Sequence, residues 1–224
     1  RLPAGTCRRR PVNPEVIVVI LFFTATLIGA LAYVLGSISP AWFAGRSRGL
    51  DLRFEGLETL DFLNAAAVLG KPVGVTVFAA DIIKGYIAVG AAMLFTDSTW
   101  AALLAGGAVV AGQIWPLFHD FAGGRGTATS AGVLIAASPW TFLITATLLA
   151  LLSAVTGRRA HAEVLTIVLL PGVAIMVERV ELAMVSLAIV LAALLIVPRW
   201  RDVEVLLGAR KANENGEPED PPLD

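Results

Sequence analysis

A glycine-rich stretch at residues 112–129, GQIWPLFHDFAGGRGTAT, holds the residue types that could bind an anion. Its glycines lack side chains, so their backbone N–H groups can converge on a phosphate. Its arginine would add a fixed positive charge, and the apolar run that follows would direct a helix N-terminus at the same place. The residues predicted to contact the phosphate are Gly123, Gly124, Arg125, Gly126 and Thr129. The alternative is a tight turn whose arginine only anchors the protein at a membrane boundary.

Two charged residues, Asp81 and Lys84, lie within the apolar run at residues 73–95. Residues three apart share one face of a helix, so the two side chains could form an ion pair. An intramembrane charge costs on the order of 2.5 to 3.5 kcal/mol, so such charges usually face the protein interior and mark a site. We therefore predict that both face other helices and contribute to substrate binding. A purely structural ion pair and a small transporter are the alternatives.

The composition places the chain among polytopic membrane proteins. Of its 224 residues, 57% are hydrophobic and only 16% are charged, which is too apolar for a soluble domain. The net charge of −1 gives no indication of nucleic-acid binding. A single cysteine, Cys7, excludes an intramolecular disulfide, and His119 and His161 are isolated in the sequence. The sequence therefore predicts neither a metal site nor a cofactor.

Six apolar runs predict an all-α fold with five to seven transmembrane helices and glycine-rich loops at one membrane face. The runs cover residues 16–35, 73–95, 100–118, 128–155, 164–177 and 182–197. Pro139 makes the fourth run either one kinked span or two shorter pieces, and the fifth run is short for a full crossing.

The remaining segments define the expected domain organisation. A basic, disordered segment at residues 1–14 precedes an integral membrane domain at 15–207, and an acidic, disordered tail follows at 208–224. Between the first two runs, the mixture of charged and apolar residues favours a segment lying along the bilayer surface. After the last run, Arg199, Trp200 and Arg201 are typical of an interfacial anchor.

The order of several motifs resembles the bacterial acyl-phosphate:glycerol-3-phosphate acyltransferases of the PlsY type. The motifs are LGSI at residues 35–38, LR at 52–53, DIIKG at 81–85 and the glycine-rich stretch itself. The resemblance covers roughly residues 32–207. It implies a small enzyme of the bacterial plasma membrane, with the glycine-rich loop in the cytoplasm. It further implies transfer of an acyl group from acyl phosphate to glycerol 3-phosphate or a related alcohol, for phospholipid biosynthesis among membrane lipids, without a metal or cofactor.

The resemblance also implies roles for individual residues. Ser37 takes the place of the family's active-site serine, and Arg53 lines the same reacting centre. Gly56 and Asn64 are the two positions of a first glycine loop, GSGNxGATN in the family and GLETLDFLN here, that agree. Together with Asp81, Lys84 and the second glycine loop, they are predicted to bind substrate.

Several departures weaken the enzyme interpretation. Gln113 and Trp200 stand where the family has histidines, and neither can act as a general base. Glu58 and Asp61 bring negative charge into the first glycine loop, where they would repel a phosphate. The alternative function is a non-catalytic relative that keeps an anion or lipid site. A compensated enzyme would instead rely on Glu58, Asp61 or His119, with an acceptor that is not a phosphate.

Overall fold

The structure, a computed structural model, describes residues 14–96, 98–179 and 181–200. Within these ranges the regular structure is entirely helical, as predicted. The helices are α1 (Pro14–Ser37), α2 (Pro40–Arg46), α3 (Phe62–Leu69), α4 (Lys71–Thr96), α5 (Thr99–Ile114), α6 (Thr127–Ala137), α7 (Pro139–Thr156), α8 (Arg159–Glu178) and α9 (Leu182–Ile196), followed by the 3-10 turn Val197–Arg199. The predicted disordered ends lie outside the described residues, except for Pro14, which begins α1.

In the described part of the chain, five helices are long and apolar enough to cross a membrane: α1 with its continuation through α2, α4, α7, α8 and α9. The two other apolar helices are shorter, with 16 residues in α5 and 11 in α6. Phe22, Phe23 and Leu27 of α1 are among many large apolar side chains left exposed by the fold, as expected of a surface that faces lipid. The structure thus confirms the predicted polytopic helical fold.

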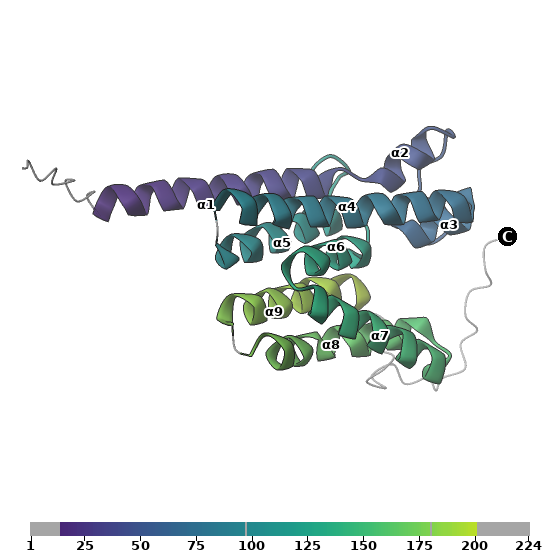
Figure 1. The fold of residues 1–224 in the computed structure, drawn as a ribbon. Helices are drawn as coiled ribbons and strands as arrows, with labels where there is room; N and C mark the ends of the chain where they lie inside the picture. The colour runs from purple at the N-terminus through teal and green to yellow at the C-terminus, as the bar shows by residue number, and fades with distance from the viewer. Residues whose placement is uncertain (1–13, 97, 180, 201–224) are drawn as a thin grey trace, which may run out of the picture.

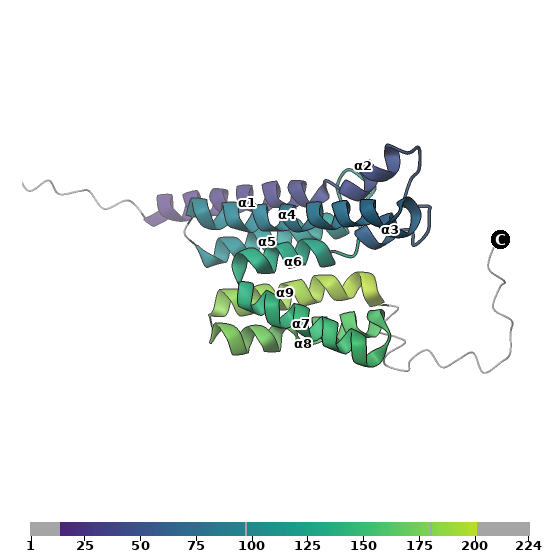
Figure 2. The same ribbon diagram turned by 45° about the vertical axis from the view of Figure 1, so that its right-hand side comes forward.

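The helices form two groups (Figures 1 and 2). α1, α4, α5 and α6 lie side by side in one group, and α7, α8 and α9 form the other. The two groups meet through α5 against α9 and α6 against α7. α2 and α3 lie at the end of the first group where α1 ends and α4 begins. This end, which we call the loop end, also holds the glycine-rich segment between α5 and α6.

Glycines allow the helices of the first group to approach closely. A Cβ atom on Gly112 of α5 would overlap the carbonyl oxygen of Tyr33 in α1, and one on Gly36 would overlap the backbone of Val109. The α1–α5 contact therefore depends on small residues, the usual basis of close helix packing in membranes.

Two boundaries settle points that the sequence left open. The fourth apolar run is two helices, because Ser138 caps the start of α7 and Pro139 occupies its first turn. The fifth run is longer than predicted, because α8 begins at Arg159 and includes Glu163, which is buried and ion-paired. A charge neutralised in this way does not end a membrane-spanning helix.

Candidate functional site

The centre of the loop end is a buried ion pair between Asp81 and Lys84 on α4. Lys84 Nζ lies 2.8 Å from Asp81 Oδ1, and both residues are buried, at 6% and 2% exposure. The prediction that both face other helices is confirmed. Asp81 Oδ1 has no further hydrogen-bond donor. The pair satisfies the charges of both groups within the protein, as a low-dielectric interior requires.

Lys84 also connects α4 to α1 and α5. Its ammonium group donates to the carbonyl oxygens of Gly36 at 3.3 Å and Ile38 at 3.0 Å, and to the side-chain oxygen of Gln113. It therefore satisfies carbonyl groups where α1 ends, a role that suits a cation at a helix C-terminus. Lys84 is the group through which the three helices meet at the loop end.

Ser37 is the last residue of α1 and lies beside these contacts. It is fully buried, and its hydroxyl donates to the carbonyl oxygen of Tyr33 at 2.9 Å. The carbonyl groups of its two neighbours, Gly36 and Ile38, are those that accept from Lys84. The structure thus brings Ser37 next to Lys84, with its hydroxyl proton engaged by the helix backbone. Its catalytic role stays a prediction.

Gln113 joins the two loops of the site. Its side-chain Nε2 donates to the backbone carbonyl of Leu60 at 3.2 Å. Its backbone carbonyl accepts from Gly124 N at 3.0 Å. A Cβ on Gly124 would lie 2.6 Å from the Leu60 carbonyl oxygen, and one on Gly123 would overlap the Gln113 carbonyl. The glycines therefore serve the packing of the loop against Gln113. Gln113 thus holds Lys84 and the first loop together.

Arg125 of the glycine-rich segment pairs with Asp61. Its Nε lies 2.7 Å from Asp61 Oδ2. Asp61 is 4% exposed and also caps α3, because its Oδ1 accepts from the backbone N–H groups of Leu63 and Asn64. Arg125 Nη1 and Nη2 have no protein partner in the described part of the chain. The acid that was expected to repel a phosphate is thus held by the arginine that was expected to bind one.

Arg53 is held by two acidic side chains of the loops. It pairs with Asp51 and with Asp120, each at 2.8 Å. Hydrogen bonds to Asp51, the larger cause, and to Asp120 raise the pKa of the Arg53 guanidinium above its ordinary value. Ser37, Lys84 and Arg125 are linked through Gln113 and the first loop, and their predicted convergence on one pocket stays a prediction. Two acids in the loops hold the Arg53 side chain, and its place in a pocket shared with Ser37, Lys84 and Arg125 stays a prediction.

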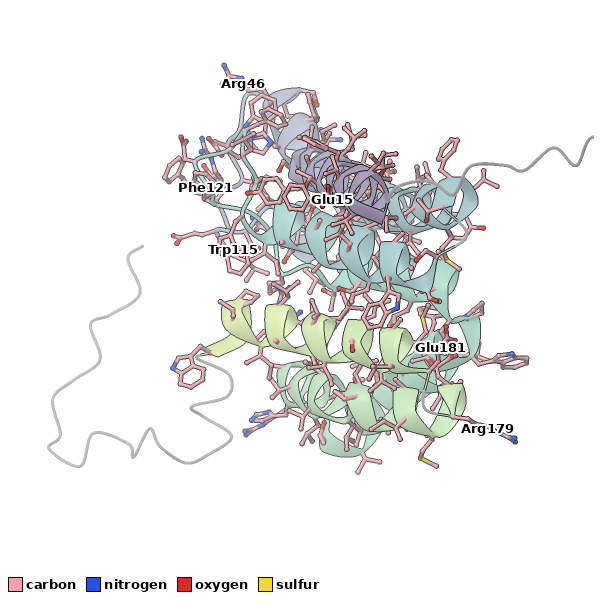
Figure 3. All side chains as sticks on the ribbon, turned by 90° about the vertical axis from the view of Figure 1, so that its left-hand side faces the viewer. Glu15, Arg46, Trp115, Phe121, Arg179 and Glu181 are labelled. Atoms are coloured by element: carbon pink, nitrogen blue, oxygen red, sulfur yellow. The ribbon has the colours of Figure 1, made fainter. Side chains whose placement is uncertain are left out.

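His119 is buried beside Arg53. Its ring stacks on Trp42 with centroids 5.0 Å apart. Burial, followed by the positive charge of Arg53, lowers the pKa of His119, so the imidazole is neutral at pH 7. Figure 3 looks from the end where α1 begins and shows Trp115 and Phe121, which flank His119 in sequence, on the same side as Arg46.

The first loop is organised by Asn64. This residue is fully buried, and its Nδ2 donates to the carbonyls of Leu52, Glu55 and Thr59. Its Oδ1 accepts from Leu57 N at 2.8 Å. Gly56 adopts a left-handed conformation with φ of 63° and packs against Asn64. Both residues shape the loop, and their contact with a substrate stays a prediction.

The start of α6 lines a small polar cavity. Gly126 precedes the helix with φ of 75°, and no side chain caps the N–H groups of the first turn. Thr129 is fully buried, and its hydroxyl oxygen has no hydrogen-bond partner. The residues lining the cavity are Asp61, Phe62, Asp81, Gln113, Gly126, Thr127, Ala128 and Thr129. Unpaired donors at a helix N-terminus are suited to an anion.

A second, apolar cavity of about 320 Å³ lies among α4, α6, α7 and α8. Its walls are formed mainly by apolar side chains, including Phe78, Leu134, Phe142, Leu149 and Leu170. Arg159 and Glu163 also line it. Phe62 and Thr127 line both cavities, so the polar and apolar cavities are adjacent. The apolar cavity can hold a long apolar chain next to the start of α6, whereas the small polar cavity is closed.

Two residues that hold the glycine-rich loop, Glu163 and Arg199, had not been predicted as part of the site. Glu163 of α8 accepts from Arg199, with its Oε2 at 3.2 Å from both Arg199 Nε and Nη2. Arg199 is 2% exposed, so the expectation that it forms an interfacial anchor is wrong. Its charge is neutralised by Glu163, which lies 36 positions away in sequence. Trp200 is 58% exposed, as an anchor would be, and Arg201 lies outside the described residues.

This arrangement defines an integral membrane protein with a glycine-rich loop next to an apolar cavity. A sequence model of the glycerol-3-phosphate acyltransferase family matches residues 26–208, so the chain belongs to that family. A glycerol-3-phosphate acyltransferase of Clostridioides difficile is 35% identical over 162 residues, covering 70% of this chain and 79% of the relative. One from Thermoanaerobacter sp. is 40% identical over 121 residues, covering 54% of this chain. That alignment spans only 61% of the relative's length.

Solved structures agree with this assignment. The fold is similar to that of PlsY (YgiH), an integral membrane glycerol 3-phosphate acyltransferase, in its glycerol 3-phosphate form. The TM-score is 0.75 with 30% sequence identity, over 84% of this chain and 94% of that one. The lysophosphatidic acid form of the same protein gives a TM-score of 0.72.

Proposed function

We propose that this protein transfers an acyl group from acyl phosphate to the hydroxyl of glycerol 3-phosphate, giving lysophosphatidate and inorganic phosphate. The observation that carries the proposal is the adjacency of the two cavities, which share Phe62 and Thr127. An acyl phosphate has a chain that fits the apolar cavity, and its charged head would lie at the start of α6, where the small polar cavity must open to admit it. We further propose that the protein lies in the bacterial plasma membrane with its loop end in the cytoplasm, where soluble glycerol 3-phosphate is available.

The transfer requires a new ester bond and the loss of one acyl–phosphate bond. The acceptor oxygen bonds to the acyl carbon, the bond from that carbon to the phosphate oxygen breaks, and phosphate leaves with the electron pair. The departing phosphate can take up the hydroxyl proton, so a histidine at position 113 is not indispensable. The Nη groups of Arg125 and the N–H groups that begin α6 are suited to binding the phosphates.

Lys84 and Ser37 would act at the reacting carbonyl. Lys84 lies at the meeting point of α1, α4 and α5, where its charge can stabilise the developing oxyanion. Ser37 would contact the reacting groups after its hydroxyl turns from the Tyr33 carbonyl, to which it now donates at 2.9 Å. Arg53 would contribute from the outer loop, after exchanging Asp51 or Asp120 for a substrate phosphate.

Donor competition in proteoliposomes tests the acyl donor. Purified protein is supplied with radiolabelled glycerol 3-phosphate and either palmitoyl phosphate or palmitoyl-coenzyme A. We expect labelled lysophosphatidate only with palmitoyl phosphate, accompanied by an equal amount of inorganic phosphate. Product formed equally well from the coenzyme A thioester would contradict the proposed donor.

The second candidate function is a relative that binds the same molecules without catalysis. The engagement of the Ser37 hydroxyl by Tyr33 and the replacement of a titratable group by Gln113 favour it. In this case palmitoyl phosphate and glycerol 3-phosphate would bind to folded protein, yet neither would be consumed.

A further inference from the structure

A buried arginine, Arg199, holds the glycine-rich loop on both sides of Gly126. Arg199 Nη1 donates to the carbonyl oxygen of Arg125 at 3.1 Å and to that of Leu195 at 2.9 Å. Its Nη2 lies 3.4 Å from the hydroxyl oxygen of Thr127. Arg199 therefore contacts the loop immediately before and after Gly126, where α6 begins.

These contacts fix the orientation of one peptide group. In a trans peptide the C=O and N–H bonds point in opposite directions. Because the Arg125 carbonyl points at Arg199, the N–H of Gly126 in the same peptide group points away from it. Gly126 lines the small polar cavity together with Thr127 and Thr129. The bond to Arg199 thus directs an N–H donor at the place where we propose that phosphate binds.

Glu163 in turn holds Arg199. Its carboxylate is 5% exposed and divides its two oxygens between two arginines. Oε2 accepts from Arg199, while Oε1 accepts from Arg159 Nε at 2.9 Å. Arg199 is almost entirely buried, so without this carboxylate its guanidinium would carry an uncompensated charge. Arg159 has a side chain that is 55% exposed, and within the described residues it contacts Glu163 and the Phe62 ring and has no hydrogen bond to the glycine-rich loop.

We propose that Glu163 is a positioning residue for acyl transfer, acting through Arg199 to keep the Arg125–Gly126 peptide in the orientation that binds phosphate. This inference rests on the proposed function. Glu163 makes no contact with the loop itself. Only one of its oxygens, Oε2, accepts from Arg199, and Arg199 in turn contacts the loop. The two arginines therefore provide a matched pair for testing.

The test compares Glu163→Gln with Arg159→Gln in full-length protein. We expect Glu163→Gln to raise the KM for glycerol 3-phosphate by about tenfold or more, because a small misplacement of a binding group has large effects. The KM for acyl phosphate and the melting temperature serve as reference values. Arg159→Gln leaves the Glu163–Arg199 contact in place. Because Arg159 lines the apolar cavity, this variant can change the KM for acyl phosphate, but its KM for glycerol 3-phosphate should stay within about twofold of the wild-type value.

Hydrogen exchange provides a readout that does not depend on turnover. Amides of the peptide covering residues 123–130 should exchange faster in Glu163→Gln than in wild type, and at the wild-type rate in Arg159→Gln. If Glu163→Gln does not fold, Arg199→Lys replaces it. This variant keeps the charge beside Glu163, but one ammonium group cannot reach all four partners of Arg199. It should show the same raised KM and faster exchange.

The outcomes separate the two proposals. If wild-type protein shows no turnover, but Glu163→Gln still exchanges amides of residues 123–130 faster than wild type, the proposed function is overturned and the positioning contact is retained. Folded Glu163→Gln with wild-type KM and wild-type exchange would overturn the positioning role. Equal effects of Glu163→Gln and Arg159→Gln would also overturn the positioning role. Both variants remove a contact of the same carboxylate, but only Glu163→Gln changes the contact with Arg199, which holds the loop.

Discussion

The Asp61 carboxylate accepts a charge-assisted hydrogen bond from Arg125 at 2.7 Å, across two loops that lie 64 positions apart in sequence. The acid therefore offsets the positive charge of the residue that we propose binds phosphate. It is also fixed in place, because its other oxygen caps α3. The charge balance of the loop end depends on this pair.

Replacing Asp61 by asparagine should strengthen binding of a phosphorylated acceptor. Asparagine is an equally good N-cap, so α3 is retained, while the negative charge beside Arg125 is lost. We expect the KM for glycerol 3-phosphate to fall about fivefold, equivalent to ~1 kcal/mol for a partly exposed ion pair. Glu58→Gln, which removes an exposed acid from the same loop, is the control and should change KM less than twofold. A KM that rises in Asp61→Asn would show that Asp61 orients Arg125.

Removing the Lys84 side chain should destabilise the protein strongly. In Lys84→Met, the Asp81 carboxylate is left buried without its partner, which typically costs about 3 to 5 kcal/mol. Unfolding in mild detergent, followed by tryptophan fluorescence, measures the loss. The double variant Lys84→Met/Asp81→Asn removes both charges and should recover part of it. A single variant as stable as wild type would be incompatible with a buried pair.

The helix contact between α1 and α5 should not tolerate a methyl group at position 112. In Gly112→Ala the new Cβ meets the Tyr33 carbonyl, and overpacking of this kind costs about 1 to 3 kcal/mol. Gly90→Ala is the matched control, because a Cβ at Gly90 of α4 meets nothing within 4 Å. We expect a lower melting temperature for Gly112→Ala and an unchanged or slightly raised one for Gly90→Ala. Equal melting temperatures would argue against the close approach.

His119 should make stability depend on pH below neutrality. Burial and the nearby cations Arg53 and Lys84 lower its pKa, although Asp51 and Asp120 oppose them. The unfolded chain, with an ordinary histidine pKa near 6.5, then binds protons more tightly than the folded protein. Its contribution to stability is therefore present above pH 6.5 and is lost as the pH falls toward the lowered pKa. In His119→Gln the melting temperature should decline less between pH 7 and pH 5. An identical decline in both proteins would contradict this role.

The sequence predicted what depends on local pattern. Apolar runs located α1, α4, α5 and α9, and the spacing of Asp81 and Lys84 predicted an inward-facing pair. Local pattern could not predict the ion pairs Asp61–Arg125 and Glu163–Arg199, because each pair joins segments that are far apart in the chain. Arg199 even carries the local pattern of an interfacial anchor, next to an exposed tryptophan. Only the packing of α8 against α9 gives it a buried carboxylate partner.

Acyl transfer in proteoliposomes, with wild-type protein and Ser37→Ala, tests the central claim most directly. Palmitoyl phosphate is the donor, and glycerol 3-phosphate and a neutral alcohol are the acceptors. Ser186→Ala, a half-buried serine of α9, is the control. We expect slow formation of lysophosphatidate, about 10² to 10⁴ below the rate of a relative with histidine at position 113, because Gln113 cannot titrate. Ser37→Ala should abolish the product, and Ser186→Ala should not. No product from folded wild-type protein, or undiminished turnover in Ser37→Ala, would contradict the account.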